Sequence, residues 1–290
     1  MMKNVVKSTD KAFSVHLATP AEWQSEVEMA RNEHWDLGHG DDRIFLNVDK
    51  NGFFIGRTEG RIVASISIVN FDPGYAHLGH YIVTPEYRGK GLGLELWTAA
   101  IEHAGERCIG LDGMPMQEEN YKKWGFRTHY HTYRIQGRAS GIAIKADNIS
   151  EVSSHHLSAI ADFDTSFSGC NRASLLSSWF TADNRQGFVV TEGASVKGVI
   201  ALRPSDEGYR IGPFYAPDEN HAIALLQTAL GALPKNALVT LDVPEQAGAT
   251  LDVLKVAGFS PLFHTCRMYR GTPPVSYQKG NNAVASLELG

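Results

Sequence analysis

The chain's organisation is clearest around the stretch Thr84-Pro85-Glu86-Tyr87-Arg88-Gly89-Lys90-Gly91-Leu92-Gly93. A β-rich run over residues 77–83 precedes its alternating glycines, and an apolar helical pattern over residues 91–104 follows them. Glycine lets a main chain approach a ligand closely, and the free N–H groups and dipole at a helix start favour an anion. Arg88 and Lys90 add positive charge. The stretch therefore predicts a phosphate cradle; the alternative is a glycine-rich tight turn.

Two other phosphate-binding motifs do not fit the spacing of these glycines. Gly89-x-Gly91-x-Gly93 differs from the GxGxxG pattern of dinucleotide-binding folds, and no GxxxxGK[ST] pattern occurs. The sequence therefore argues against a dinucleotide fold and against a nucleotide triphosphatase.

Outward from this loop, the pattern predicts a mixed α/β fold in which most strands are antiparallel. Thr19 and Pro20 are typical of a helix start, Glu59-Gly60 of a hairpin turn, and Gly125 of a helix end. The expected strands cover residues 13–17, 52–55, 61–70, 77–83, 109–112 and 129–135, and the expected helices cover residues 20–34, 91–104 and 118–124.

An internal repeat extends this pattern over most of the chain. Residues 125–134 (GFRTHYHTYR) reappear as residues 258–267 (GFSPLFHTCR), and the Leu-Asp pair at 111–112 reappears at 241–242. Matches in the same order indicate a duplication, and so long a period predicts that each copy buries its own core. We expect one domain over residues 1–136, a second over 137–270 with the junction between 136 and 150, and a tail over 271–290 with a possible short strand at 283–289.

Composition narrows the class of protein. The chain has 290 residues, of which 43% are apolar, with 27 Lys+Arg against 32 Asp+Glu. This apolar content excludes disorder, and the slight acidity disfavours a nucleic-acid partner. Three scattered cysteines indicate neither disulfides nor a thiolate zinc site, and no signal-like or membrane-spanning apolar run occurs. We expect a cytoplasmic protein without a membrane or metal partner.

Two motifs together resemble a known superfamily. Arg88 to Gly93 matches the [RQ]xxGx[GA] signature of the GNAT superfamily of acyl-CoA-dependent N-acyltransferases. Residues 121–126 (YKKWGF) resemble the superfamily's Yxxx-Gly-Phe element. The resemblance covers residues 10–136, and residues 137–270 are similar to the degenerate partner domain of two-domain members.

The resemblance implies an acetyl-CoA-dependent N-acetyltransferase whose acceptor is the amine of a small, amino-acid-like metabolite. Acetyl-CoA would lie in a V between strands 77–83 and 109–112, with a backbone N–H near Val83 polarising the thioester carbonyl. Tyr121 would protonate the departing thiolate. The implied acetyl-CoA-binding residues are Ile82, Val83, Arg88, Gly89, Lys90, Gly91, Leu92, Gly93, Gln117, Asn120 and Tyr121. An alternative function is a non-catalytic acyl-CoA-binding sensor.

The chain departs from the family pattern at two places. Many relatives carry Asn six residues before the tyrosine, where this chain has Pro115, so Gln117 or Asn120 would contact the pantetheine arm instead. No glutamate occurs on strand 77–83 to act as the base. His77 and His80 lie there, and either one could accept the proton of the amine, or both could be packing residues.

Other polar residues have two interpretations each. Asp112 could orient the amine or cap a turn, and the acids after the first helix, Asp36, Asp41 and Asp42 beside Trp35, are expected to form a solvated surface rather than an amine site. Arg172 could bind a carboxylate, but a surface ion pair is the expected alternative; Asp164, Asn171 and the turn at 211–213 could line a pocket with it.

The second copy has lost the chemistry of the first. When Pro217 is aligned with Pro85, Asn220, His221, Ile223 and Leu225 stand opposite Arg88 and the three glycines, and Leu254 replaces Tyr121. We therefore expect no acyl transfer there. This copy would either complete the acceptor pocket or serve as a structural platform.

Overall fold

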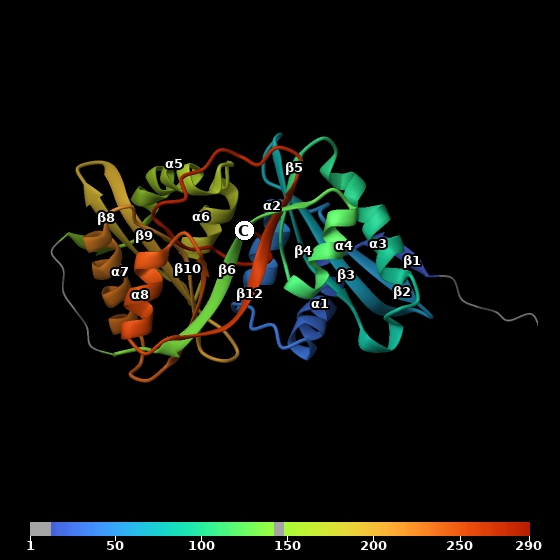
Figure 1. Ribbon diagram of the computed structural model, residues 1–290, viewed down its shortest axis with the longest axis horizontal. Helices are drawn as coiled ribbons and strands as arrows, with labels where there is room; N and C mark the ends of the chain where they lie inside the picture. The colour runs from blue at the N-terminus through green and yellow to red at the C-terminus, as the bar shows by residue number, and fades with distance from the viewer. Residues whose placement is uncertain (1–12, 142–147) are drawn as a thin grey trace, which may run out of the picture.

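The computed structural model describes residues 13–141 and 148–290 as two similar halves joined side by side (Figure 1). The first half contains strands β1 (Ser14–Leu17), β2 (Phe53–Thr58), β3 (Arg61–Asn70), β4 (Tyr75–Val83), β5 (Cys108–Gly113) and β6 (Arg127–Arg138), and helices α1 (Pro20–Asn32), α2 (Asp41–Val48), α3 (Leu92–Ile101) and α4 (Glu118–Lys123). The second half contains strands β7 (Ile149–Glu151), β8 (Gln186–Glu192), β9 (Ser195–Pro204), β10 (Tyr209–Tyr215), β11 (Leu238–Pro244), β12 (Ser260–Arg270) and β13 (Asn281–Ala283), and helices α5 (Leu157–Ser168), α6 (Ala173–Thr181), α7 (Glu219–Ala232) and α8 (Gly248–Val256). Part of the expected junction, residues 142–147, lies outside the described residues.

The expected helices and strands of the first half are present, and the residues that begin or connect them do so as the sequence indicates. Thr19 caps α1 in a capping box with Glu22, whose Oε2 accepts a hydrogen bond of 2.8 Å from the Thr19 N–H. Glu59 and Gly60 both have positive φ angles, as a two-residue hairpin turn requires. Helix α2 was not predicted, because it is only eight residues long and Gly40, its N-cap, makes no side-chain cap.

All strands form one sheet in which the two halves exchange their long last strands. The order is β1-β2-β3-β4-β5-β12-β6-β11-β10-β9-β8-β7, with β13 added beside β10. Strand β12 of the second half therefore lies between β5 and β6 of the first half, and β6 pairs with β11 of the second. Figure 1 shows β6 and β12 side by side at the centre. The pairs β4–β5 and β10–β11 are parallel and the others antiparallel, which confirms the predicted class.

Two reciprocal ion pairs explain why the repeat kept its Leu-Asp and terminal Arg. Asp112 of β5 lies opposite Arg267 of the exchanged β12, whose Nε donates a hydrogen bond of 2.9 Å. Asp242 of β11 lies opposite Arg134 of the exchanged β6, whose Nε and Nη2 donate bonds of 2.7 and 2.9 Å. Arg210 also donates to Asp242. Each aspartate thus binds an arginine from the other half.

Removing Asp242 is expected to destabilise the protein strongly. Burial alone would raise the pKa of Asp242, but the charges of Arg134 and Arg210 lower it overall, so the pair is ionised at neutral pH. Asp242→Ala leaves two buried guanidinium groups without their carboxylate, which we expect to cost about 3 kcal/mol of unfolding free energy. Urea unfolding measures this loss.

The matched control is Asp206→Ala, which breaks exposed contacts with Arg31 and His39 and should cost at most about 1 kcal/mol. Equal shifts of the urea midpoint for the two variants would contradict a structural role for the buried pair.

Helices cover both faces of the sheet, and the core is shared. On one face, α3 packs on the first half and α7 on the second. On the other face, helices α1, α2, α5 and α6 form a single cluster in which Phe45 stacks on Trp179 at 6.0 Å. The expectation that each copy buries its own core is therefore wrong on this face, where the four helices share one cluster. On the α3 and α7 face the two halves have separate clusters, although each includes residues of the strand exchanged from the other half.

The end of the tail, from residue 281, is largely buried, whereas residues 271–280 are exposed or half-buried. The expected strand at 283–289 is wrong in position and length, because β13 covers only Asn281–Ala283 and the residues after it turn back on themselves. Ala283 lies in the core on the α7 face, whereas Ala285 and Leu289 lie in the core shared by α1 and α5. The tail therefore crosses between the halves from one face of the sheet to the other.

Candidate active site

Strands β4 and β5 separate in the middle of the first half. Their parallel pairing ends at Leu78↔Leu111, although β4 continues to Val83. Two residues of β4, His80 and Tyr81, lie opposite a single residue of β3, and His80 has a φ of +51°. Such an extra residue is a β-bulge, which bends its strand. The bulge turns β4 away from β5 and opens the V that the resemblance implies.

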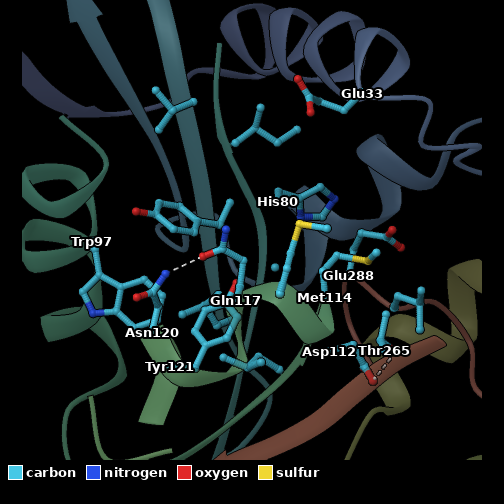
Figure 2. Close-up of a pocket in the computed structure, with 18 of the residues that line it drawn as sticks. Glu33, His80, Trp97, Asp112, Met114, Gln117, Asn120, Tyr121, Thr265 and Glu288 are labelled. Atoms are coloured by element: carbon cyan, nitrogen blue, oxygen red, sulfur yellow. Dashed lines mark hydrogen bonds between the residues drawn. The ribbon is translucent and has the colours of Figure 1, made fainter. Parts of the chain in front are cut away.

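A cavity of about 660 Å³ occupies this V. Of the predicted residues, His80, Ile82, Val83, Arg88, Asp112, Gln117, Asn120 and Tyr121 line it. The predicted residues Gly89, Lys90, Gly91, Leu92 and Gly93 do not line it. Figure 2 shows Trp97, Asn120 and Tyr121 on one side of the cavity and His80, Met114 and Glu288 on the other. Trp97 belongs to the core under α3, and the His80 ring contacts Trp23 of the core on the opposite face. The cavity therefore joins the two faces of the sheet.

One backbone N–H of β4 points into the opening. The Thr84 N–H donates to Val63 O of β3 at 2.9 Å, and successive N–H groups along a strand point in opposite directions. The N–H and C=O of Val83 therefore point away from β3, and Val83 O indeed accepts a hydrogen bond of 2.8 Å from Arg88 Nε. This geometry supports the prediction of a carbonyl-polarising N–H at Val83.

The glycine loop has the conformation that an anion cradle needs. Gly89 and Gly91 have φ angles of +73° and +83°, and nothing lies within 4 Å of where their side chains would be. Gly91 is the N-cap of α3, so the N–H groups of Leu92 and Gly93 in its first turn have no partner within the helix. An open, glycine-lined helix start of this kind favours anions, and diphosphate binding here stays a prediction.

The two cations of the loop have other contacts. The Arg88 guanidinium donates to Glu33 after α1 as well as to Val83 O, and Lys90 Nζ lies 4.9 Å from the centre of the Tyr87 ring. Arg88 therefore ties the loop to α1 and to the end of β4. Phosphate contact by the Arg88 and Lys90 side chains stays a prediction.

Tyr121 stands at the α4 side of the cavity, held by packing. Its ring lies 5.8 Å from Trp97 and 6.2 Å from Phe126, measured between ring centres. A side-chain carbon at Gly113 would lie 2.5 Å from the Tyr121 ring, so glycine at the end of β5 leaves room for it. Burial, and then the neighbouring Tyr81, raise the pKa of Tyr121, so its phenol keeps its proton. It can therefore donate a hydrogen bond to a departing sulfur.

Filling the space beside Gly113 is expected to slow the reaction without blocking donor binding. Gly113→Ala should displace the Tyr121 ring and lower kcat about thirtyfold, because small misplacements of a reacting group are costly. The matched control is Gly248→Ala, where nothing lies within 4 Å. Steady-state kinetics with acetyl-CoA measure kcat and KM, and an unchanged kcat for Gly113→Ala would contradict this positioning.

Gln117 and Asn120 lie on the same side as Tyr121. Asn120 Nδ2 donates a hydrogen bond of 2.7 Å to Gln117 Oε1, and both side chains line the cavity (Figure 2). Their amide groups are available to the amide-containing arm of the donor, which is the role that the resemblance implies.

The two histidines of β4 differ in position. His77 does not line the cavity; its ring contacts Tyr75 Oη at 2.9 Å, and burial and Arg267 hold its pKa well below the usual value. His80 lines the cavity, but its Nδ1 is 2.8 Å from Ser67 Oγ. Burial lowers the pKa of His80 to about 4, so its ring is neutral and weakly basic at neutral pH.

Two of the three acids after α1 are buried, contrary to the expected solvated surface, whereas Asp42 is half-buried and accepts a hydrogen bond from Gln24. Asp41 is buried and accepts from Arg203 at 2.9 Å and also from Arg185, both of the second half. Asp36 is buried and accepts from Ser205 Oγ at 2.8 Å. These acids were misjudged because the sequence does not show that the second half covers this loop.

Asp112 and Arg172 need similar corrections. Asp112 neither caps a turn nor is free to orient an amine, because Arg267 holds it. Arg172 is buried rather than on the surface, and it donates to Asp164 at 2.6 and 3.0 Å and to Tyr215 Oη at 2.8 Å. None of Asp164, Asn171, Arg172 and residues 211–213 lines the cavity.

In the second half the chain's own tail occupies the corresponding V, and a smaller cavity of about 330 Å³ remains beside it between α7 and α8. The parallel pairing of β10 with β11 ends at Ile211↔Leu241, as that of β4 with β5 ends at Leu78↔Leu111. Beyond it, β13 pairs with β10, and the Val284 N–H donates to Asp242 O of β11 at 3.0 Å. The strand thus occupies the V in which a pantetheine arm would lie.

Within residues 13–141 and 148–290, no group of three or more His, Cys, Asp or Glu is placed to hold a metal ion. No helix in that same part of the chain is long and apolar enough to cross a membrane.

The sheet with its V, the open glycine loop and Tyr121 define an acyl-CoA-dependent N-acyltransferase built from two related halves. Residues 15–126 match the acetyltransferase (GNAT) family, and residues 160–281 match an acetyltransferase (GNAT) domain. The chain is 42% identical over 273 residues to the holothin acyltransferase of a Pseudoalteromonas species, an alignment that covers 94% of this chain and 93% of the relative. The chain therefore belongs to the GNAT superfamily as a tandem member and is an acyltransferase.

Solved structures agree with this fold. A candidate acetyltransferase from Pyrococcus horikoshii superposes with a TM-score of 0.82 at 18% identity and covers 96% of both chains. A tandem GNAT protein from the clavulanic acid biosynthesis pathway superposes with a TM-score of 0.60 at 13% identity, covering 90% of this chain and 99% of its own. At these identities the likeness concerns the fold.

Sequence reasoning missed several residues that line the cavity. Glu33 and Trp97 come from the first half, Phe263 from the exchanged β12, and Glu288 from the tail. Trp97 could have been found from its place on the buried face of α3. No local pattern marks Phe263 or Glu288, because strand exchange and the path of the tail bring them to the site.

Proposed function

We propose that this acyltransferase uses acetyl-CoA to acetylate the amine of a small metabolite, and that holothin is the first acceptor to test. The observation that carries the proposal is the cavity lined by Arg88 beside the open glycine loop, by Val83 and by Tyr121, which reaches the opposite face of the sheet at His80. The similarity to a holothin acyltransferase over nearly the whole chain supports an acceptor of that kind.

The roles of the residues follow from their places. The main-chain N–H groups from Gly89 to Gly93 would bind the diphosphate, and the amides of Gln117 and Asn120 would contact the pantetheine arm. The Val83 N–H would stabilise the charge that develops on the carbonyl oxygen. Tyr121 would donate its proton to the departing sulfur.

The later half would contribute to the acceptor side of the site without binding a donor. Phe263 and Thr265 of β12 line the cavity, whereas β13 fills the second V. We keep the domain boundaries at residues 136 and 270 as a proposal about which segments were duplicated. The three buried, free cysteines support a reducing, cytoplasmic location.

A thiol-release screen tests the proposal. Acetyl-CoA is supplied with holothin and, in parallel, with a panel of primary amines that includes amino acids, and mass spectrometry identifies the acetylated product. Propionyl-CoA and hexanoyl-CoA replace acetyl-CoA in a second series. Acetylation of holothin with acetyl-CoA as the fastest donor is the expected result. A preference for hexanoyl-CoA would contradict the proposal that acetyl-CoA is the donor. Turnover of other amines but not of holothin would contradict holothin as the acceptor.

A further inference from the structure

Glu288, a residue of the tail, brings into the cavity a carboxylate that none of the roles proposed above uses. Glu288 is 8% exposed, lines the cavity and lies on the side of His80, across from Tyr121 (Figure 2). The tail backbone crosses directly over the β4 bulge, since a side-chain carbon at Gly79 would lie 2.2 Å from Glu288 O. The side chain therefore stands where β4 and β5 part.

Glu288 has no cationic partner among the residues that the structure describes. Its Oε2 accepts from Ser286 Oγ, and the Glu288 N–H donates to the same hydroxyl at 3.1 Å. A nearly buried carboxylate without an ion pair is unusual in a fold whose other buried acids are largely paired.

The surrounding charges leave this carboxylate available to a substrate. The titratable groups that sense its charge come from every element around it: Glu26 of α1, His80 of β4, Asp112 of β5, Arg134 of β6, Arg203 of β9 and Arg210 of β10. The three arginines already bind Asp41 or Asp242. None of them therefore forms an ion pair with Glu288.

We propose that Glu288 is the general base of the first half, and this rests on the proposed acetyl transfer. The amine nitrogen forms a bond to the thioester carbonyl carbon and gives its proton to the Glu288 carboxylate, directly or through one water. The C–S bond breaks, its electron pair stays on sulfur, and sulfur takes the proton of Tyr121. Exchange with solvent then returns the proton from Glu288 and restores that of Tyr121.

The opposite placement of the two groups fits this chemistry. Glu288 and Tyr121 stand on different sides of the cavity, so the amine can approach one face of the thioester while the thiolate departs toward the other. His80 is the neighbouring alternative, but Ser67 engages its Nδ1. The tail thus places β13 in the second V and Glu288, the proposed base, in the first.

The test compares Glu288→Gln with wild type on the amine that wild type acetylates fastest in the thiol-release screen. We expect kcat/KM at pH 7 to fall about a hundredfold, the usual effect of removing a general base. The Kd for acetyl-CoA should stay within twofold. Activity should recover as pH rises, because the acceptor then loses its proton to solvent. Glu288→Asp should restore part of the rate.

The matched control is Glu245→Gln, the same change at a half-exposed glutamate outside the cavity, which should keep full activity. If Glu288→Gln does not fold, Ser286→Ala, which removes only the hydroxyl that holds the carboxylate, should lower kcat at pH 7. Retention of more than half of kcat/KM, or a loss that does not depend on pH, overturns the base role. If wild type acetylates no amine, the proposed function itself fails, and the base role fails with it.

Discussion

Replacing Gly91 by aspartate is expected to raise the KM for acetyl-CoA about a thousandfold, which corresponds to ~4 kcal/mol of lost donor binding. Gly91 caps α3 with a φ of +83° and faces open space, so a side chain there would project into the anion cradle. The aspartate carboxylate would take the place of the diphosphate at the helix start and repel it. Since the reacting groups are untouched, kcat should change much less.

Two controls separate charge from backbone strain. Gly91→Asn has nearly the same shape without the charge and should raise the KM only about tenfold, since the close approach is lost but the repulsion is absent. Gly60→Asp introduces the same carboxylate at a φ of +79° in the β2–β3 turn, where nothing lies within 4 Å, and should leave kinetics unchanged. Calorimetry gives the Kd for acetyl-CoA; a Gly91→Asp value within threefold of wild type would exclude the loop as the diphosphate site.

Replacing Tyr121 by phenylalanine is expected to lower kcat about a thousandfold, within the usual range for a positioned proton donor. The ring would keep its packing on Trp97 and Phe126, so only the hydroxyl is lost. The Kd for acetyl-CoA should therefore stay close to that of wild type. The thiolate would leave without a proton, which raises the barrier of the step in which the C–S bond breaks.

The pH profile adds a second readout for Tyr121. Because burial raises its pKa above the ordinary value of 10.0, the phenol stays protonated, and wild-type kcat should show no loss from this group up to pH 10. Tyr209→Phe removes a phenol outside the cavity and should keep full activity. A Tyr121→Phe enzyme with wild-type kcat at every pH would show that another group, or solvent, protonates the sulfur.

The asymmetry of the two halves has a structural basis as well as a sequence basis. The second half lacks the glycine loop, and β13 occupies its V by pairing with β10. A pantetheine arm could lie between β10 and β11 only by displacing β13, whose three residues are buried. The tail thus occupies the V of the second half and also lines the cavity of the first half.

Much of the donor side of the site was predictable from local sequence. Glycines at 89, 91 and 93, a helix after them and a tyrosine before Gly125 act over short distances, because backbone freedom and helix ends depend on neighbouring residues. The structure places Arg88, Gln117, Asn120 and Tyr121 around one cavity, as expected. Their contacts with the donor remain predictions.

The acceptor side could not be predicted in the same way. Asp41 and Asp112 look like free carboxylates in the sequence, and only the arginines from the other half show that they are structural. Glu288 lies in an unpatterned tail, and nothing local indicates that it reaches the cavity.

The sequence by itself determined the mixed α/β class, the duplication and the glycine loop before α3, since each depends on residue type and short spacing. Only the tertiary structure decided the exchange of β6 and β12, the shared core, the strand in the second V and the carboxylate in the first. These features join residues that lie far apart in the sequence. Which buried charges find partners, and which are left for a substrate, depends on packing across the whole chain rather than on any local pattern.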